Sequence, residues 1–314
     1  MEKLTIALLS GGISSEREVS ISSGNQVYEA LDHNKYDIIR YDPKTDLPQL
    51  VVDASKIDAA LIILHGPFGE DGTVQGLLDL LEIPYQGSGV LGSAIGMNKL
   101  VSKHLYEKSG LLVPSYVVIG KNDTLDADAC VQRLGLPLVV KPVGSGSSVG
   151  ISIVKSKDLL KEAVDKAFEQ DSMVLIEAYI DGIELTGGVI GNDQLEALPI
   201  IEIIPSESYD FFDYEAKYTA GATNEICPAR INDVMTKKAQ EIAKTAHKAL
   251  FCKGYSRTDV ILKDQDMYVL ETNTIPGMTA TSLLPLAAGE AGIPFSQLLD
   301  RLIELGIEGH KVNR

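Results

Sequence analysis

The stretch that says most about the fold and its chemistry is residues 256–274, which read SRTDVILKDQDMYVLETNT. Its polar centre predicts a hairpin of two antiparallel strands that turns near Gln265. Other strands in this half of the chain are expected to be joined by connectors of very different lengths. Together these features predict mixed or antiparallel sheets in the second half of the chain.

A register symmetric about Gln265 would bring four polar residues of the hairpin together. Arg257 would face Asn273. Asp259 would face Glu271, and because residues two apart on a strand share a face, all four would lie on one side. Two carboxylates and an amide oxygen suit Mg²⁺, with substrate phosphates completing its shell. The alternative is a polar face turned to solvent, and a slip of one residue would remove the alignment.

The first third of the chain alternates strand and helix signals. Residues 4–9 form a short apolar run before a double-glycine turn, and Ser15 with Glu18 has the spacing of a capping box that would start a helix. A second buried strand is expected at residues 59–64, with a helix from Gly72 onward. This βαβ order predicts an open parallel sheet.

The rest of the chain reads as two further units, each with its own strands and helices. A long polar loop and a helix precede the hairpin, and two short helices follow it. We therefore predict an α/β protein of three domains, which are residues 1–97, 98–186 and 187–314. The second domain should have strands at 136–141, 151–154 and 174–180, and the third should have a loop at 206–230 and a helix at 233–250.

The composition excludes several classes of protein. The 314 residues carry 28 Lys and Arg against 44 Asp and Glu, and the net charge of −16 argues against a nucleic-acid binder. No apolar run approaches the ~20 residues of a membrane helix, so no membrane partner is expected, and the N-terminus does not read as a signal peptide. The three cysteines fit neither a disulfide framework nor a zinc site, so a cytoplasmic protein is expected.

A glycine-rich loop, KPVGSGSSVG, begins at Lys141, where a strand is expected to end. Small residues let backbone N–H groups approach an anion, and the lysine adds a positive charge. The loop lacks the GK[ST] ending of a Walker A motif and runs between two strands, like a flap over phosphates. The alternative is a flexible hairpin loop with a solvated lysine.

Four other places could bind ligands. Glu16 could hold a substrate ammonium at the carboxyl edge of the first sheet, or it could simply be favoured by the helix dipole. His65, in HGPFGEDG, could equally be a structural histidine. The loop at 206–230 has the length of a lid or of a packed surface loop. Gly277 and Ser282 could bind a carboxylate, or Ser282 could be a plain helix cap.

These motifs occur in one order along nearly the whole chain, and the ordered set resembles the D-alanine–D-alanine ligases, a family of the ATP-grasp superfamily. The pieces that carry the resemblance are SEREVSISSG, HGPFGEDGT, KPVGSGSSVG, YEAKY, YSRTD and ETNTIPGMT. The resemblance implies a three-domain ATP-grasp architecture, in which an N-terminal open parallel sheet precedes two mixed or antiparallel α+β domains that enclose ATP. It also implies two Mg²⁺ ions, with Mn²⁺ as a substitute, D-alanine as substrate, and a homodimer.

The resemblance further implies a role for each matching residue. The nucleotide would be bound by Lys99, Lys141, Ser148, Glu177, Ile180, Glu184, Lys217 and Asn273, with Lys217 nearest the transferred phosphate. The metal ions would be held by Asp259, Glu271 and Asn273. The first D-alanine would be held by Glu16 with Ser147 and Tyr218, and His65 is counted with them. Arg257 and the Gly277 N–H would stabilise the tetrahedral intermediate, and Ser282 and Leu283 would line the second D-alanine site.

The implied reaction has two steps. The carboxylate of one D-alanine attacks the γ-phosphate of ATP, and the amine of a second D-alanine then displaces phosphate from the acyl phosphate, which the long loop would shield from water. The chain departs from many relatives at Ala178, Thr281 and the pair Gly187 and Gly188, but it keeps the charged groups. Tyr218 favours an amine as the second nucleophile.

Three alternatives compete with this interpretation. Another ATP-grasp ligase could join a different amino-acid pair. A catalytically silent nucleotide-binding regulator would not need Arg257, Asp259 and Lys217 together. An NAD-dependent dehydrogenase would need a G-x-G-x-x-G fingerprint after the first strand, which this chain lacks.

Overall fold

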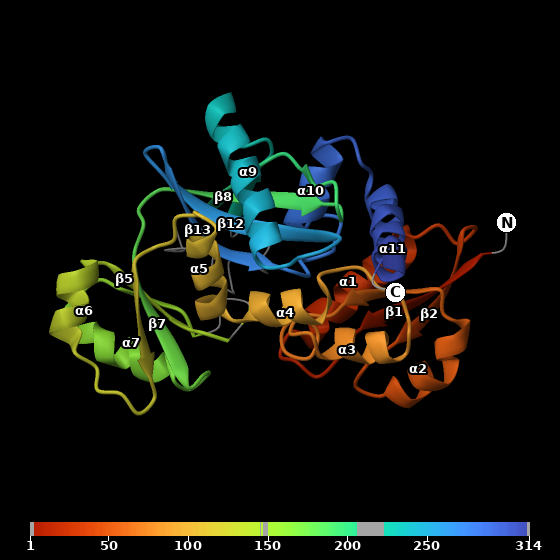
Figure 1. Ribbon diagram of the computed structural model, residues 1–314, viewed down its shortest axis with the longest axis horizontal. Helices are drawn as coiled ribbons and strands as arrows, with labels where there is room; N and C mark the ends of the chain where they lie inside the picture. Colours follow the sequence, from red (N-terminus) through yellow and green to blue (C-terminus); the bar gives the residue numbers. More distant parts are fainter. Residues whose placement is uncertain (1–2, 145, 147–149, 206–222, 313–314) are drawn as a thin grey trace.

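The computed structural model describes residues 3–144, 146, 150–205 and 223–312 and arranges them around three β-sheets (Figure 1). The N-terminal and central sheets lie at opposite ends of the molecule, and the C-terminal sheet lies between and above them in this view. The predicted α/β class, with a parallel sheet first and antiparallel sheets after it, is confirmed. Among the described helices, none has the length and hydropathy that crossing a membrane requires.

The N-terminal sheet is parallel and is covered on both faces. Alternate residues along residues 4–10 and 59–63 point into two separate cores, with Leu8 in one and Leu9 in the other. This explains why both strands read as continuous apolar runs. Its strands in spatial order are β2 (Tyr36–Tyr41), β1 (Leu4–Ser10) and β3 (Ala59–Ile63), and its helical segments are α1 (Arg17–Ala30), α2 (Leu47–Asp53), the 3₁₀ turn Ala54–Lys56 and α3 (Thr73–Leu80).

The start of α1 differs from the predicted capping box. The residue before the helix is Glu16, and its side chain makes no capping hydrogen bond, so the expected pairing of Ser15 with Glu18 is wrong. Ser14 acts instead: its Oγ accepts a hydrogen bond from the Glu16 N–H at 3.2 Å and donates one to the His65 carbonyl at 2.7 Å. The start of α1 is therefore tied to the chain that leaves β3.

The central sheet is antiparallel, with two helices packed on one face (Figure 1). Its strands in spatial order are β4 (Tyr116–Gly120), β7 (Met173–Ala178), β5 (Leu138–Pro142) and β6 (Ser152–Val154), and its helices are α6 (Ala127–Leu134) and α7 (Leu160–Ala167), which follows the 3₁₀ turn Lys157–Leu159. Two consecutive helices, α4 (Gly89–Met97) and α5 (Lys99–Lys108), lead into it from the N-terminal sheet.

The C-terminal sheet is also antiparallel and holds the predicted hairpin at one edge. Its strands in spatial order are β11 (Thr223–Ile226), β10 (Ile201–Pro205), β8 (Ile183–Ile190), β12 (Tyr255–Lys263) and β13 (Asp266–Asn273), with β9 (Glu196–Ala197) beside β8. The helices of this part are α9 (Asp233–Ala249), α10 (Leu283–Glu290) and α11 (Phe295–Val312). At 18 residues, α11 is longer than the short final helix that was expected.

The glycine pair in β8 allows helices to pack closely on both faces of this sheet. A Cβ at Gly187 would lie 3.0 Å from the Cβ of Ala243 on α9, and a Cβ at Gly188 would lie 2.7 Å from Leu284 Cδ1 on α10. A side chain at Gly188 would have to displace Leu284. The two glycines therefore fix how α9 and α10 sit against the strands of the hairpin.

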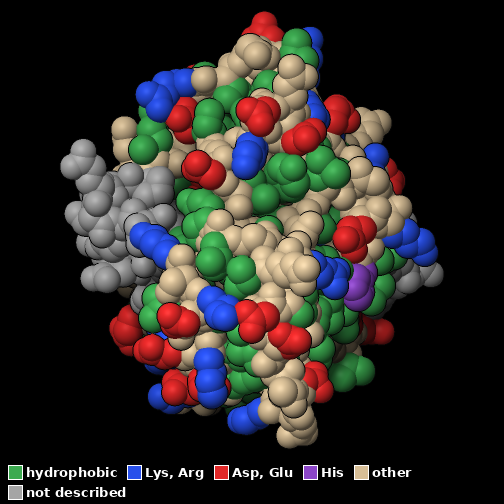
Figure 2. Space-filling view, turned by 90° about the vertical axis from the view of Figure 1, so that its left-hand side faces the viewer, with side chains coloured by type: hydrophobic (Ala, Val, Ile, Leu, Met, Phe, Trp, Pro, Cys, Tyr) green, Lys and Arg blue, Asp and Glu red, His purple; other side chains and the backbone are tan. Residues whose placement is uncertain are grey.

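The last helix brings the C-terminal end of the chain against the N-terminal sheet. Leu298 and Leu302 of α11 share a buried cluster with Leu61 and Ile63 of β3, so this helix packs on the N-terminal sheet. The three sheets follow the three predicted units, while the predicted domain limits remain predictions. On the face shown in Figure 2, acidic, basic and hydrophobic side chains are mixed and do not form one charged patch.

Candidate active site

The register of the hairpin is as predicted where the polar residues lie. Arg257 pairs with Asn273, and Asp259 pairs with Glu271. Near the turn the register differs by one residue, because Lys263 pairs directly with Asp266 across a two-residue turn. A β-bulge after Asp259 places one extra residue on β13 and produces the shift.

Asp259 is the best-anchored side chain of this cluster. Arg257 donates to both of its carboxylate oxygens, from Nε to Oδ1 at 3.1 Å and from Nη2 to Oδ2 at 3.0 Å. Asn273 Nδ2 donates to Oδ2 at 3.0 Å, and Thr186 of the neighbouring strand β8 donates to Oδ1. Because Arg257 and Asp259 are both buried, this bidentate pair holds the guanidinium and the carboxylate in one fixed orientation.

Lys99 connects the hairpin to the central sheet. Helix α5 begins after Asn98, whose side chain caps it by accepting from the Val101 N–H at 3.0 Å. The Lys99 N–H donates to the carbonyl of Val143, just beyond β5, at 3.0 Å. Its Nζ lies 3.9 Å from Glu271 Oε2. The predicted nucleotide and metal residues of the two sheets therefore meet at this lysine.

Lys141 and Glu177 face each other inside the central sheet, and a lysine that the sequence analysis missed joins them. Lys141 Nζ lies 2.7 Å from Glu177 Oε2, and Lys103 Nζ of α5 lies 2.8 Å from Glu177 Oε1. Burial alone would raise the pKa of Glu177, but the ammonium groups of Lys141 and Lys103 outweigh burial and hold that pKa below its usual value. Glu177 is therefore an ionised carboxylate between two cations.

Two further nucleotide candidates lie on the segment that leads from β7 of the central sheet into β8 of the C-terminal sheet. Ile180 follows β7, which ends at Ala178, and Glu184 lies near the start of β8. Both are partly buried, and Glu184 is paired in register with Ile261 of β12. The segment between β7 and β8 thus connects the central sheet to the sheet that carries the hairpin.

A second cluster of carboxylates lies where the N-terminal sheet meets the glycine-rich loop. Gly146 is close to both, because a Cβ built on it would lie 3.9 Å from Oε2 of Glu16 and 3.9 Å from Oε2 of Glu70. A Cβ at Gly66 would lie 2.9 Å from Oε2 of Glu16, and the Gly66 N–H donates to Oε2 of Glu70 at 2.8 Å. Two carboxylates at one place favour a ligand with an ammonium group.

His65 belongs to this cluster. It is 6% exposed, and its Nδ1 lies 3.8 Å from Glu70 Oε1. Burial alone would lower the pKa of His65, but the carboxylates of Glu70 and Glu16 outweigh burial and raise that pKa above its usual value. The sequence HGPFGEDG predicts Glu70 and Asp71 as caps of the helix that follows, but the carboxylate that accepts from the Thr73 N–H at the start of α3 is that of Asp71.

Gly277 and Ser282 lie together in the segment that follows β13. Ser282 precedes α10 but does not cap it through its side chain. Its Oγ instead accepts from the Thr279 N–H at 3.1 Å and lies 2.7 Å from Thr279 Oγ1. A Cβ at Gly277 would lie 3.1 Å from Ser282 Oγ, and Leu283 beside it is buried. The strand that carries Glu271 and Asn273 therefore leads directly into this second group.

Several predicted residues lie outside the described part of the chain. These are Ser147 and Ser148 of the glycine-rich loop and Lys217 and Tyr218 of the long loop. The predicted limits of the long loop were partly wrong, because residues 223–226 form strand β11, which pairs with β10.

The hairpin residues offer suitable donors for a magnesium ion that is also bound by a ligand's phosphates. No group of three or more His, Cys, Asp or Glu side chains among the described residues forms a metal cage of its own. Asp259, Glu271 and Asn273 instead supply two carboxylates and one amide oxygen from facing positions. Mg²⁺ commonly takes one or two carboxylates from the protein and further oxygens from phosphates and water, so this donor set fits it.

Comparisons with known proteins agree with the resemblance. Sequence profiles described as D-ala D-ala ligase N-terminus and C-terminus match residues 42–88 and 105–304. A D-alanine--D-alanine ligase of Syntrophobacter fumaroxidans is 62% identical over 98% of this chain and 99% of its own length. A second, from Desulfotalea psychrophila, is 51% identical over 99% of this chain and 97% of its own.

Solved structures give the same result. The D-alanine--D-alanine ligase of Bacillus anthracis complexed with ATP has a TM-score of 0.87 and 39% identity, covering 99% of this chain and all of its own. The VanG D-Ala:D-Ser ligase of Enterococcus faecalis has a TM-score of 0.82 and 34% identity, covering 97% of this chain and all of its own.

Proposed function

The chain belongs to the D-alanine–D-alanine ligase family and has its ATP-grasp architecture, and we propose that the clusters described above join two D-alanine molecules at the expense of ATP. The activity is that of an ATP-dependent ligase. The observation that carries the residue assignments is a pair of approaches made by the glycine-rich loop and the helix beside it. Lys99 lies 3.9 Å from Glu271 of the hairpin, and Gly146 lies beside Glu16 and Glu70.

The triphosphate of ATP is assigned to the space between the central sheet and the hairpin. Lys99 and Lys141 neutralise phosphate charge there, and Glu177, Ile180 and Glu184 lie along the remaining nucleotide site. Asp259, Glu271 and Asn273 would hold Mg²⁺, or Mn²⁺ in its place, and the ion would supply positive charge beside the phosphates. Lys99 supports this placement because it contacts both the end of β5 and Glu271.

The first D-alanine is assigned to the cluster beside Gly146. Its ammonium group pairs with Glu16 and Glu70, and His65, whose pKa these carboxylates raise against the effect of burial, would balance part of their charge when protonated. Its carboxylate then points toward the phosphates, and attack of one carboxylate oxygen on the γ-phosphorus gives D-alanyl phosphate and ADP. The roles of Ser147, Ser148, Lys217 and Tyr218 in closing this site follow from the family resemblance alone.

The second D-alanine is assigned to the segment after β13. Ser282 and Leu283 lie at the start of α10, where a helix N-terminus and a hydroxyl favour a carboxylate. The amine of this second D-alanine attacks the acyl carbon and phosphate leaves. Arg257 and the Gly277 N–H would then stabilise the tetrahedral oxyanion, because Asp259 holds the guanidinium in place before charge develops.

The experiment that tests this function measures phosphate release by the purified chain with ATP and Mg²⁺, and weighs the product by mass spectrometry. D-Alanine alone is expected to support turnover and give a product of dipeptide mass. L-Alanine is the negative control, while D-serine or D-lactate added to D-alanine reveals a different second nucleophile. ATP binding without D-alanine-dependent turnover would contradict the ligase function and favour a silent nucleotide-binding regulator.

Two further expectations are part of the proposal. The family resemblance favours a homodimer, which sedimentation of the purified chain would test. A cytoplasmic location agrees with three cysteines that are all free thiols in the structure.

A further inference from the structure

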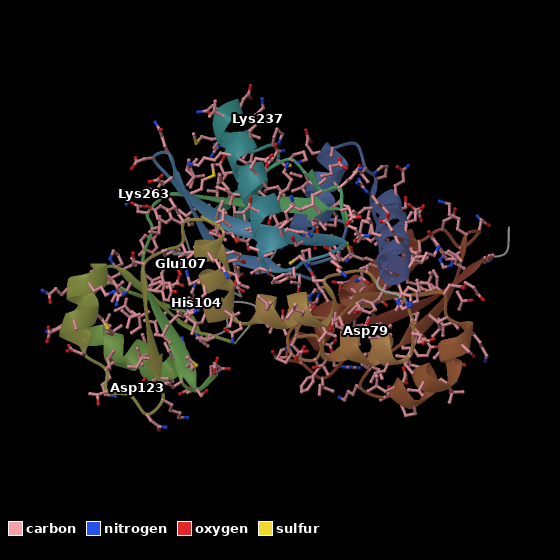
Figure 3. The ribbon with its side chains drawn as sticks, in the orientation of Figure 1. Asp79, His104, Glu107, Asp123, Lys237 and Lys263 are labelled. Atoms are coloured by element: carbon pink, nitrogen blue, oxygen red, sulfur yellow. The ribbon has the colours of Figure 1, made fainter. Side chains whose placement is uncertain are left out.

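Lys103 is a fully buried lysine for which the proposed reaction gives no role. It lies on α5, one turn after Lys99 and therefore on the same side of the helix. Figure 3 shows this helix, marked by His104 and Glu107, between the central sheet and β13. The Lys103 side chain is 0% exposed, so it does not contact a ligand in the solvent-accessible site directly.

Two strands of the central sheet supply partners for the Lys103 ammonium group. Its Nζ lies 2.8 Å from Glu177 Oε1 on β7 and 5.4 Å from the centre of the Tyr116 ring on β4. Tyr116 is itself fixed to α5, because its hydroxyl donates to Glu107 Oε2 at 3.1 Å. Lys103 is thus held between the helix and the sheet in one orientation.

The charge of the cluster is what makes Lys103 informative. Lys103 and Lys141 both contact Glu177, so with both lysines protonated the three contacting groups have a net charge of +1. Burial lowers the pKa of Lys103, while the carboxylates of Glu177 and Glu107 oppose that effect. A buried charge without a partner is unfavourable, and an anion beside the cluster would balance it. Lys141 is the member that retains slight exposure, so a phosphate would meet the excess charge at its ammonium group.

We propose that Lys103 is a positioning residue for the nucleotide: it occupies one oxygen of Glu177, so that Lys141 keeps enough positive charge to bind a phosphate of ATP. This inference rests on the proposed placement of the nucleotide phosphates at Lys99 and Lys141. Without Lys103, both oxygens of Glu177 would turn to Lys141 and the remaining pair would be neutral. The phosphate would then meet a lysine whose charge is already compensated.

The test compares Lys103→Met with the double variant Lys103→Met/Glu177→Gln. Lys103→Met leaves an intact Lys141–Glu177 pair and no unpaired charge, so the fold is expected to survive. Its KM for ATP, and its Kd for ATP measured without D-alanine, should rise about 10- to 100-fold. Its kcat at saturating ATP and its KM for D-alanine should stay within about twofold of wild type, since no group at the reacting atoms has changed.

The double variant separates charge from packing. It restores the net charge of +1 by removing the competing carboxylate, so it should bind ATP more tightly than Lys103→Met does. Because Glu177 is itself assigned to the nucleotide site, Glu177→Gln alone is the reference, and the double variant should match its ATP affinity to within about threefold. Lys103→Arg, which keeps the charge, should also retain ATP affinity. If the double variant binds ATP no better than Lys103→Met, or if kcat falls together with affinity, Lys103 supports packing only and the inference is wrong.

Lys141→Met keeps this inference distinguishable from the proposed function. If Lys141→Met leaves the Kd for ATP unchanged, the phosphates are not where the proposed function places them. If Lys141→Met weakens ATP binding and Lys103→Met does not, the nucleotide site stands and only the role of Lys103 is overturned. Melting temperatures of all variants check that each comparison is made on folded protein.

Discussion

Asp259 faces Glu271 across the hairpin because β13 carries one more residue than β12 between that pair and the turn. The turn itself has two residues, Asp264 and Gln265, and the first of them has a positive φ of 56°. Without the bulge, regular pairing from this turn would place Asp259 opposite Leu270 and move Glu271 to the other face. The bulge is therefore what unites the acidic residues of the proposed metal site.

The Arg257→Ala variant is expected to bind ATP but to lose ligation. Arg257 acts on charge that develops in the transition state, so kcat should fall by about 10²- to 10³-fold while the Kd for ATP changes little. Arg230→Ala is a matched control, because Arg230 also makes a bidentate pair with a carboxylate, that of Glu202 on β10. A kcat within a few-fold of wild type for Arg257→Ala would contradict the assigned role.

The Asp259→Asn variant is expected to need more Mg²⁺. The amide keeps one oxygen but loses the negative charge that attracts the ion, so the Mg²⁺ concentration for half-maximal activity should rise by about tenfold or more. Asp266→Asn, on the exposed end of the same hairpin, is the control. An unchanged Mg²⁺ titration for Asp259→Asn would show that the metal is bound elsewhere.

His65 should make the stability of the chain depend on pH. Its folded pKa is raised above the ordinary value of 6.5, mainly because Glu70 and Glu16 outweigh the effect of burial. A histidine whose pKa is higher in the folded than in the unfolded protein stabilises the fold when it is protonated. This stabilisation is complete at pH values below the unfolded pKa and is lost as the pH rises through the folded pKa. Glu70→Gln should therefore lower the free energy of unfolding more at pH 6 than at pH 9.

Denaturant unfolding of wild type and Glu70→Gln at both pH values measures this difference. NMR titration of the His65 ring protons should show a lower pKa in the variant. Equal losses at pH 6 and pH 9, with an unshifted His65 titration, would mean that Glu70 does not hold the histidine in its protonated form.

The Gly188→Ala variant should disturb the second D-alanine site from a distance. The added methyl would lie 2.7 Å from Leu284 Cδ1, so the Leu284 side chain must move at the start of α10, next to Ser282 and Leu283. The KM for the second D-alanine should rise, and stability should fall by about 1–3 kcal/mol. Gly289→Ala on the same helix is the control, because nothing lies within 4 Å of its added Cβ. Similar effects of both substitutions would remove the special role of Gly188.

The parts of the site that lie close in sequence could be predicted, and those assembled across sheets could not. Hairpin pairing depends on a few residues around one turn, so Arg257, Asp259, Glu271 and Asn273 were grouped correctly, although the bulge was not anticipated. Lys103 and Glu177 are separated by 74 positions in the sequence. Periodicity assigns a lysine on a helix to solvent, and only the packing of α5 on the central sheet reveals its partner.

Glu70 was missed for a different reason. Its neighbour Asp71 and the helix that follows make capping a sufficient explanation for an acidic pair at this point of the chain. The signal that could have found Glu70 is the glycines around it. One of them, Gly66, lies so close to Glu16 that a Cβ there would be 2.9 Å from the Glu16 carboxylate. The strand β11 was missed because four residues at the end of a long polar loop carry little periodicity.

The most direct test of the proposed two-step reaction follows oxygen atoms through one reaction cycle. The chain is supplied with ATP, Mg²⁺ and D-alanine labelled with ¹⁸O in both carboxylate oxygens, and the products are weighed by mass spectrometry. Attack of a carboxylate oxygen on the γ-phosphate, followed by displacement of phosphate by the second amine, predicts one ¹⁸O in each released phosphate and a dipeptide that retains three. Phosphate without label, or turnover without a dipeptide, would contradict the proposed mechanism.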